Sequence, residues 1–410
     1  MKFTHVVNAL VIALSCHNDV HGQVTFLEKY RPEYRMFRNS LFNFIGRSDS
    51  EKSYNWNYKK GKVQKPFPES HKFFCDPKGP GKRSDSIPKS VHQLTPGDID
   101  IIAAMGDSLT AGNGALATNI LQVLIENKGV SWSIGGQSKW QKYLTVPNII
   151  KVFNPNLYGY SLSDGYSTDK RSRFNTAEIG AMSRDIPHEA KVLVKRMTSD
   201  SRVKLNEHWK MITILIGPND FCLDMCYAKN PEKTIDYHER DLISALRTLR
   251  KNLPRTMVNL VTPPSMKVIT ELRGKPAECE SSHHVECPCA FGFAYRNKRQ
   301  YYFDIMERWK DVVEKVSRMD EFNGEDFTVN NQPFLKNVTF PTLPNGNHDF
   351  TYMSMDCFHL SQKGYARAAN ALWNNMMEPD GQKSTNWQKE FTKFVCPTVD
   401  RPYLATKGNS

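Results

Sequence analysis

Short apolar runs alternate with amphipathic helical patterns through most of this chain of 410 residues. Leucines at helical spacing predict a helix over positions 242–253, and apolar residues over 365–376, after a Ser361 N-cap, predict another. Buried strands that alternate with amphipathic helices are typical of a parallel sheet covered on both faces, so the sequence predicts an α/β fold. The runs of buried-strand length are 99–105, 157–162, 211–216 and 257–261.

The chain before the first predicted strand has a different composition. Residues 23–97 are polar, aromatic and rich in proline, and no helical or strand periodicity is sustained there. We therefore expect an irregular N-terminal extension over 23–97 and one α/β domain over 98–380. The tail over 381–410 is expected to pack on this domain and to be tethered by a disulfide through Cys396.

The first residues have the pattern of a secretory signal peptide. Lys2 precedes an apolar run over positions 6–14, which is too short to span a bilayer. We expect cleavage before Gln23, which removes residues 1–22; cleavage before Cys16, or a buried N-terminal strand in place of a signal, are the alternatives. No later stretch has the apolar length of a membrane helix, so we expect a secreted protein without a transmembrane segment.

Cysteine usage agrees with an oxidising compartment. Of nine cysteines, Cys16 leaves with the signal peptide, and the remainder most simply form disulfides whose connectivity the sequence leaves open. A rival interpretation is a zinc site, because cysteines and histidines at short spacings can hold this metal: Cys279, His283, His284, Cys287 and Cys289. The disulfide candidates are Cys75, Cys222, Cys226, Cys279, Cys287, Cys289, Cys357 and Cys396.

Charge narrows the choice of partners only slightly. The chain has 55 Lys and Arg against 43 Asp and Glu, a net charge of +12 that favours anionic surfaces. These basic residues are scattered, and no basic block with interleaved aromatic residues occurs. We therefore expect no nucleic-acid partner.

Chemistry is expected just after the strands, because ligands bind outside the carboxyl ends of strands in parallel sheets. The first predicted strand ends at Gly106, and Asp107 and Ser108 follow, which places a serine hydroxyl on a glycine turn before a helix. We expect Asp107 to cap that helix. Thr110 stands where the G-x-S-x-G nucleophile elbow requires glycine, which argues against an α/β-hydrolase.

Other polar groups suited to catalysis lie beside later predicted elements. Asn219 offers a side-chain amide beside Gly217, and Gly180 precedes a helical stretch where its N–H is free to point at an oxyanion. Asp356 and His359 lie three residues apart before the last predicted helix. A carboxylate so placed can fix the imidazole tautomer and stabilise the imidazolium that forms when the histidine takes a proton.

Together and in this order, these segments resemble the four blocks of the GDSL or SGNH hydrolases. The blocks are Gly106 to Leu109, Gly180, Gly217 to Asp220, and Asp356 to His359. The surrounding sequence is similar to the animal phospholipase B branch of this family, and the similarity extends over residues 67–405 as one unit. Because this unit lacks the C-terminal membrane segment of the mammalian pattern, we expect a single-unit, secreted form. The similar segments are 90–94, 106–115, 131–136, 356–359, 371–379 and 396–403.

The resemblance implies a three-layer α/β/α sandwich with a flavodoxin-like, five-stranded parallel sheet, and an esterase that needs no metal or other cofactor. Ser108 is implied as the nucleophile, His359 as the base and Asp356 as the residue that orients the base. The N–H groups of Ser108 and Gly180 and the amide of Asn219 are implied as the oxyanion hole.

The implied substrates are phospholipids and lysophospholipids, met by peripheral contact with lipid interfaces. Two alternatives remain, because catalytic residues do not define the alcohol part of a substrate. One is an esterase that acts on small acyl or carbohydrate esters, and the other is a secreted lipid-binding protein that has lost turnover.

Two cysteine positions bear on the implied site, and one sequon bears on the surface. A disulfide from Cys357 would restrict the loop that carries the base. Cys222 and Cys226 follow Asn219, and we hypothesise that they pair with each other. The sequon that begins at Asn337 predicts a surface glycan.

Overall fold

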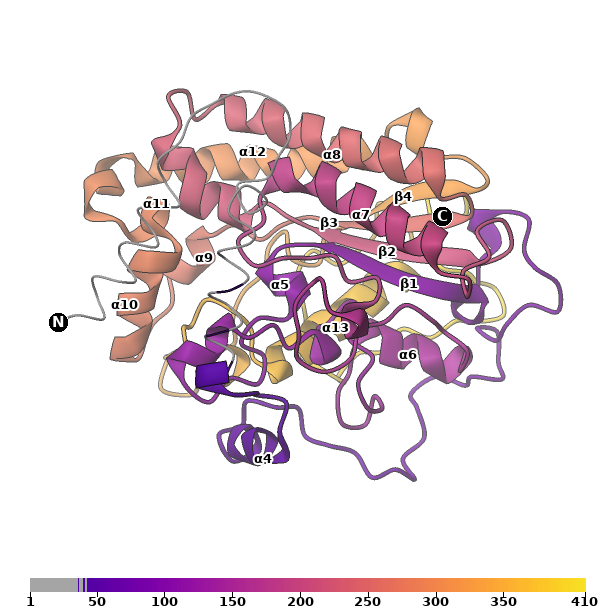
Figure 1. Ribbon diagram of the computed structural model, residues 1–410, viewed down its shortest axis with the longest axis horizontal. Coiled ribbons are helices and arrows are strands. Elements are labelled where there is room, and N and C mark those ends of the chain that lie inside the picture. Colours follow the sequence, from indigo (N-terminus) through magenta and orange to yellow (C-terminus); the bar gives the residue numbers. More distant parts are fainter. Residues whose placement is uncertain (1–35, 37–39, 41–42) are drawn as a thin grey trace.

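A parallel sheet forms the centre of the computed structural model, which describes Met36, Ser40 and residues 43–410. Each strand pairs in parallel with the next one along the chain, so their carboxyl ends lie at the same edge of the sheet (Figure 1). The strands, in spatial and chain order, are β1 (Ile99–Gly106), β2 (Trp209–Leu215), β3 (Thr256–Val261) and β4 (Phe327–Gln332).

The sheet has one strand fewer than the resemblance implied. The predicted strands that became β1, β2 and β3 are confirmed, whereas β4 was not predicted. The apolar run over 157–162 is no regular strand, because Gly159 has a φ of +107° that interrupts the extended backbone. Tyr158 still makes a single parallel bridge to Ile101, and Asn175 makes another to β1. The expected fifth strand is therefore reduced to isolated bridges beside β1.

Helices cover both faces of the sheet (Figure 1). Along β1, Ile101, Ala103 and Met105 pack with one set of helices, while Ile102 and Ala104 pack with the other set. This alternation confirms the predicted three-layer α/β/α sandwich. On the first face lie α7 (Ile186–Ser199), α8 (Lys233–Asn252) and α12 (Arg299–Ser317); on the second lie α6 (Val146–Phe153) and α13 (Gln362–Met377).

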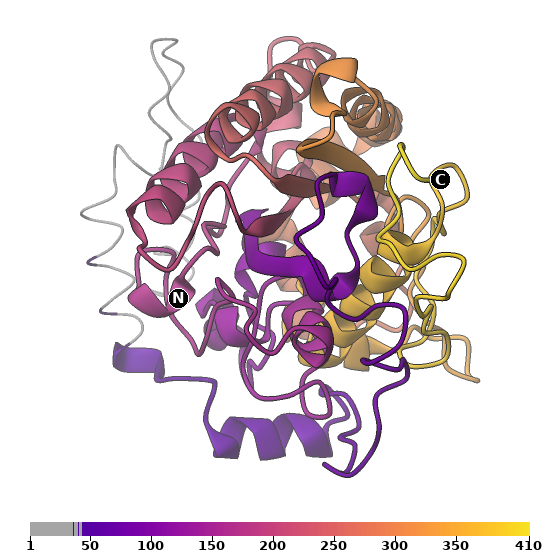
Figure 2. The same cartoon turned by 90° about the vertical axis from the view of Figure 1, so that its right-hand side faces the viewer.

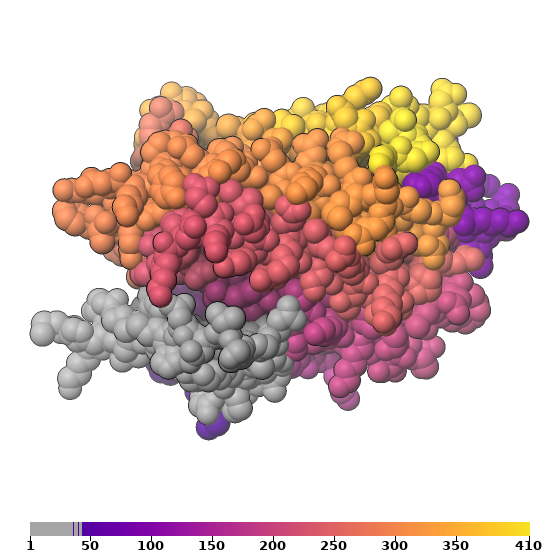
Figure 3. Space-filling model, turned by 90° about the horizontal axis from the view of Figure 1, so that it is seen from above, coloured from indigo at the N-terminus to yellow at the C-terminus, as the bar shows by residue number. Residues whose placement is uncertain are grey.

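The two helices predicted from apolar spacing are confirmed. In α8, Leu242, Leu246 and Leu249 form a fully buried stripe against the sheet. Helix α13 begins after Ser361, whose Oγ accepts a hydrogen bond from the Gly364 N–H at 3.3 Å. Figure 3 views the molecule from the side of α8 and α12, which lie next to each other on its outer surface.

Three short helices form a separate layer beyond the carboxyl ends of the strands (Figure 1). This layer has its own apolar cluster, in which Phe221 and Trp309 pack around six of the cysteines. It therefore lies where the sequence predicts the chemistry. The helices are α9 (Lys267–Thr270), α10 (Ala277–Glu286) and α11 (Pro288–Phe291).

The N-terminal extension is more regular than its composition predicts. It contains helix α4 (Glu51–Lys59), capped by Ser50, whose side chain accepts from the Ser53 N–H. The prediction of irregular structure is wrong here, because capping and aromatic contacts stabilise a helix that has no apolar stripe. Val63 and Leu94 are buried in the core beside α13, so the extension packs on the sheet domain.

The C-terminal tail lies against the extension (Figure 2). Cys396 is disulfide-bonded to Cys75, and the Leu404 N–H donates to the Leu94 carbonyl at 2.8 Å. The two segments that flank the sheet domain in the sequence are therefore joined to each other in space.

Two predictions that relate to secretion concern the signal peptide and the transmembrane segment. The predicted signal peptide, residues 1–22, and Cys16 lie outside the described residues. Within the part of the chain that is described, no helix is both long and apolar enough to cross a membrane.

Candidate active site

The turn after β1 positions Ser108. Gly106 has a φ of +140°, and a Cβ at this position would lie 2.1 Å from the Leu215 carbonyl oxygen on the neighbouring strand, so only glycine fits. Asp107 then caps helix α5 (Ser108–Ala111), because its Oδ1 accepts from the Leu109 N–H at 2.9 Å. The prediction that Asp107 is a cap is confirmed, and Ser108 is the first residue of a helix at the carboxyl end of the sheet.

Ser108, His359 and Asp356 form one chain of hydrogen bonds. His359 Nε2 lies 2.8 Å from Ser108 Oγ, and His359 Nδ1 lies 2.5 Å from Asp356 Oδ2. Asp356 Oδ1 accepts from the backbone N–H groups of Phe358 and His359, each at 3.0 Å. The carboxylate is thus fixed by its own turn, and it leaves Nε2 of the imidazole facing the serine hydroxyl.

The carboxyl groups of Asp356 and Asp107 have opposite pKa shifts. Burial favours a raised pKa for Asp356, but the charge of His359 and hydrogen bonds from His359 and Glu286 lower it well below its ordinary value. Burial raises the pKa of Asp107 to about 7, although the Leu109 N–H and His359 act in the other direction. Asp356 is therefore the ionised partner of the imidazole at neutral pH.

The three loops that carry the expected oxyanion donors are joined to one another at the carboxyl end of the sheet. Gly106 on β1 pairs with Leu215 on β2, so the segments that carry Ser108 and Asn219 leave adjacent strand ends. The Gly180 loop is held by hydrogen bonds from the Glu178 N–H to the Gly106 carbonyl and from Asn219 Nδ2 to the Ala181 carbonyl, at 3.1 and 2.9 Å. Among the described residues, no acceptor is found for the N–H of Ser108 or Gly180.

The position of Gly180 corrects one expectation. It does not open a helix, because α7 begins only at Ile186, after a 3₁₀ turn over Ser183–Asp185. Gly180 instead has a φ of +76° in a loop. Its N–H is oriented by this left-handed backbone rather than by a helix terminus.

Three disulfides join the helical layer to the loops of the site. Cys222, which follows Asn219, is bonded to Cys287, and Cys226 is bonded to Cys289. The hypothesis that Cys222 and Cys226 pair with each other is therefore wrong. Cys222 and Cys226 lie on consecutive turns of the segment after β2. Cys222 faces Cys287, the residue before α11, and Cys226 faces Cys289 within α11.

The segment with zinc-like spacing has another role. Cys279 is bonded to Cys357, so all three of its cysteines are engaged in disulfides and offer no thiolate to a metal. His283 is buried and its Nε2 donates to the Cys357 carbonyl at 2.9 Å, whereas His284 is exposed. Cys279 and His283 hold the loop that carries Asp356 and His359.

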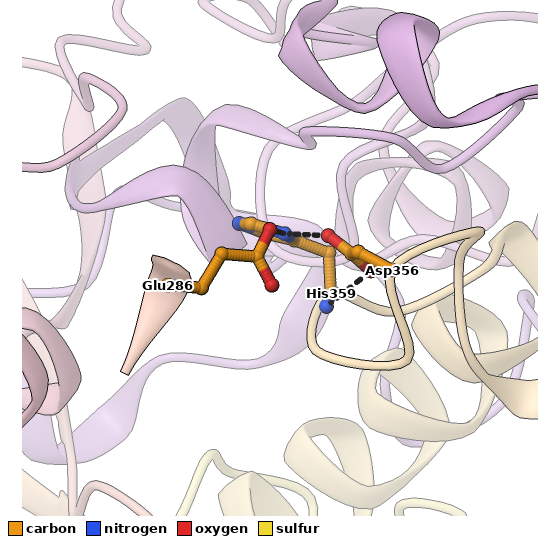
Figure 4. Close-up of side chains that lie close together, drawn as sticks. All are labelled: Glu286, Asp356 and His359. Carbon is orange, nitrogen blue, oxygen red and sulfur yellow. Dashed lines mark hydrogen bonds and ion pairs between the residues drawn. The ribbon is translucent and has the colours of Figure 1, made fainter. Parts of the chain in front are cut away.

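Another group has the donor atoms for a metal. Glu286, Asp356 and His359 each place one donor atom within 4.8 Å of the others, and their side chains point toward one another (Figure 4). In His359, however, Nδ1 already bonds to Asp356 and Nε2 bonds to Ser108. A metal on this histidine would have to break one of those bonds, so the geometry fits proton transfer better than metal binding.

Sequence reasoning missed three residues that lie beside the site. Glu189 Oε2 accepts from the Gly106 N–H at 2.8 Å, and Lys62 Nζ donates to the Met353 carbonyl at 2.6 Å, just before Asp356. The third is Glu286. Glu189 had a signal, since it is a carboxylate within the buried face of α7, but Lys62 and Glu286 lie in polar segments without one.

The family comparison agrees with the fold and the site. The sequence profile of the family described as GDSL-like Lipase/Acylhydrolase matches residues 102–372, a range that includes Ser108, Gly180, Asn219, Asp356 and His359. The chain belongs to this family of ester hydrolases, as its resemblance predicted.

Curated relatives give a finer similarity. The chain is 35% identical over 386 residues to the phospholipase B1, membrane-associated, of Mus musculus, which covers 93% of the chain and 24% of that relative. It is 39% identical over 348 residues to the protein of the same name of Homo sapiens, covering 82% of the chain and 23% of the relative. The chain thus spans about a quarter of the length of these relatives.

Proposed function

We propose that this chain is a secreted serine esterase that hydrolyses the acyl ester bonds of phospholipids and lysophospholipids. The observation that carries the proposal is the continuous hydrogen-bonded chain from Ser108 through His359 to the buried Asp356. Residues 98–380 form the proposed catalytic domain. The extension over 23–97 and the tail over 381–410 flank this domain in the sequence.

The proposed reaction follows from which atoms face each other. Ser108 Oγ attacks the ester carbonyl while His359 Nε2 accepts its proton, and the resulting imidazolium is stabilised by Asp356. His359 then protonates the leaving alcohol, and the acyl group stays on Ser108. A water molecule, activated by the same imidazole, releases the fatty acid and restores the serine.

The negative charge of the tetrahedral intermediate needs donors that are in place before the reaction. The N–H groups of Ser108 and Gly180 and the side-chain amide of Asn219 are the proposed donors. One N–H of Asn219 is used to bind the Ala181 carbonyl, so its orientation is fixed and its second N–H remains for the oxyanion. Because donors from three loops must converge, the packing of these loops on the strand ends supports the proposal.

The substrate class is proposed from the relatives named phospholipase B1. An enzyme of this kind removes both acyl chains, so the lysophospholipid left by the first cleavage must itself be a good substrate. The net charge of +12 would concentrate the protein at anionic lipid interfaces, and added salt would weaken this contribution.

The disulfides support the proposal of secretion. Four disulfides are formed among the described residues, which is typical of proteins from an oxidising compartment. Asn337 is exposed, which is compatible with the proposed glycan at this sequon. Analysis of the protein secreted by expressing cells would identify its N-terminus and any glycan.

The proposal is tested with purified protein and its Ser108→Ala variant on diacyl phospholipid, lysophospholipid and acetylated sugar esters. We expect free fatty acid to approach two per phospholipid, with only transient lysophospholipid, and no release by the variant. Lysophospholipid as a stable end product would indicate cleavage at a single position. Hydrolysis of sugar or small esters alone would favour the small-ester alternative, and no hydrolysis at all would favour the silent lipid-binding protein.

A further inference from the structure

One face of helix α10 contacts the loop that carries Asp356 and His359. The four residues of this face follow at intervals of three, four and seven from the first, which is the spacing of a single helical stripe. They are not the apolar residues that usually form such a stripe. They are Cys279, Ser282, His283 and Glu286.

The first three residues of the stripe hold the backbone of the loop. Cys279 is disulfide-bonded to Cys357. Ser282 Oγ donates to the Asp356 carbonyl at 2.8 Å, and His283 Nε2 donates to the Cys357 carbonyl at 2.9 Å. None of these three contacts involves the Asp356 side chain, which lies beside the last residue of the stripe.

Glu286 meets the side chains of the loop. Its Oε1 lies 3.9 Å from His359 Nδ1, and its carboxyl group lies beside that of Asp356 (Figure 4). Glu286 Oε2 is buried and has no hydrogen-bond partner among the described residues. Two carboxyl groups this close in a buried site cannot both be ionised at low cost, so one of the two is protonated.

The surrounding groups decide which of the two holds the proton. Asp356 is stabilised as an anion by two backbone N–H groups, by His359 and by the nearby charge of Lys62, whereas among the described residues Glu286 has no ion pair with a cation besides the imidazole. Burial and the charge of Asp356 raise the pKa of Glu286 well above its ordinary value. His283, the other titratable group on this face of α10, is occupied by the Cys357 carbonyl. The proton therefore belongs to Glu286.

We propose that Glu286 is a positioning residue, which in its protonated form donates a hydrogen bond to Asp356 and so holds this carboxylate against His359. The inference rests on the proposed triad. A neutral neighbour orients Asp356 without adding a second negative charge beside the imidazole. No atom is transferred to or from Glu286 during turnover.

The test compares two replacements of similar size. Glu286→Gln keeps a neutral hydrogen-bond donor, whereas Glu286→Met removes the donor and keeps the volume. Glu280→Gln, on the exposed side of α10, is the matched control. The readouts are kcat, KM and the pH profile of kcat/KM on a soluble short-chain ester, with melting temperatures to compare folding, and Ser108→Ala measured in parallel.

We expect Glu286→Met to lower kcat by about tenfold with KM little changed, because Asp356 loses its fixed orientation. Glu286→Gln should keep kcat within about threefold of wild type and leave the acid limb of the profile where it is, since it replaces one neutral group by another. An unchanged kcat in the Met variant, or equal losses in both variants, would overturn the inference. So would a shift of the acid limb toward lower pH in the Gln variant, because it would show that Glu286 is ionised.

The proposed function fails separately from this inference. If Ser108→Ala remains active, the triad itself is wrong. If Ser108→Ala is inactive while Glu286→Met equals wild type, the triad stands and only the role of Glu286 is lost.

Discussion

Cys357, which lies between Asp356 and His359, is covalently joined to Cys279 on helix α10. The two cysteines are 78 residues apart in the sequence, and their Cα atoms are 5.4 Å apart. Cys357 also has a φ of +55°, so the loop makes a tight turn at the point where it is anchored. The turn brings Asp356 and His359 face to face, and the disulfide fixes the turn to a helix outside the sheet.

The first prediction concerns this disulfide. The double variant Cys279→Ser with Cys357→Ser should lose activity at a lower temperature than it loses secondary structure, because the catalytic loop is released before the sheet unfolds. Activity and far-UV circular dichroism, followed together on heating, measure the difference. The matched control removes Cys75 and Cys396. Their loss should lower the free energy of unfolding by about 2–5 kcal/mol, and the temperatures of both transitions should fall together. Coincident transitions in the Cys279 variant would contradict the local role.

The second prediction concerns the nucleophile. A fluorophosphonate probe should label Ser108 and no other serine, because within the described part of the chain only this serine hydroxyl faces an imidazole nitrogen whose opposite side is held by a carboxylate. Peptide mapping after labelling identifies the site. Ser183 is an internal comparison, since its hydroxyl lies 2.7 Å from His238 Nδ1, but the opposite nitrogen, His238 Nε2, has no hydrogen-bond partner among the described residues. Labelling at Ser183 in place of Ser108 would contradict the assignment.

The third prediction concerns the oxyanion hole. Asn219→Ala should lower kcat by about 10²- to 10³-fold with a smaller change in KM, because the lost donor acts mainly on the transition state. Steady-state kinetics on a soluble ester measures both constants. If kcat were unchanged, Asn219 would be a loop residue that only binds the Ala181 carbonyl.

The fourth prediction concerns the buried cap Asp107. Burial raises its pKa from 3.8 to about 7. Between these two pH values the carboxyl group is protonated in the folded state and ionised in the unfolded state. The stability that this group contributes is complete below about pH 4 and falls as the pH rises to about 7, by up to about 4 kcal/mol at 1.36 kcal/mol per pH unit.

Asp107→Asn tests this sign, because asparagine keeps an oxygen for the Leu109 N–H but does not titrate. Unfolding free energies from denaturant titrations at pH 5 and pH 8 should show that the variant gains on wild type as the pH rises. A difference between the two proteins that does not change with pH would show that Asp107 is already ionised in the fold.

The fifth prediction concerns metal. Treatment with a chelator should leave activity unchanged, because both nitrogens of His359 are used by Asp356 and Ser108. Elemental analysis of the purified protein should find less than one zinc per chain. Activity that is lost on chelation and restored by one metal would make Glu286, Asp356 and His359 the first residues to examine.

The sheet could be predicted where strands are apolar and uninterrupted. β1, β2 and β3 are such strands, but β4 has the sequence FTVNNQ, and its polar end gives no apolar run. Gln332 is buried on β4 because a side-chain partner satisfies it: its Nε2 donates to Asn259 Oδ1 on β3 at 2.8 Å. This hydrogen bond depends on the neighbouring strand, so the burial of Gln332 cannot be predicted from the local sequence pattern.

The site could be predicted to a different extent for each residue. Ser108, Asp356 and His359 stand in short motifs beside predicted elements, and the family resemblance implied that they form one site. Glu286 and Lys62 could not be found this way, since their contacts join the loop to segments far away in the sequence. The disulfide partners were equally hidden, because spacing along the chain does not determine which sulfurs meet.

The Cys75–Cys396 disulfide determines how the protein responds to proteolysis. It joins residues 321 positions apart, and so closes a covalent ring that contains the whole sheet and every residue proposed for catalysis. A single cut in an exposed loop of this ring, such as the one over 342–347, leaves both pieces attached to each other. The nicked protein therefore migrates as one species on a non-reducing gel, and its fragments separate only after reduction.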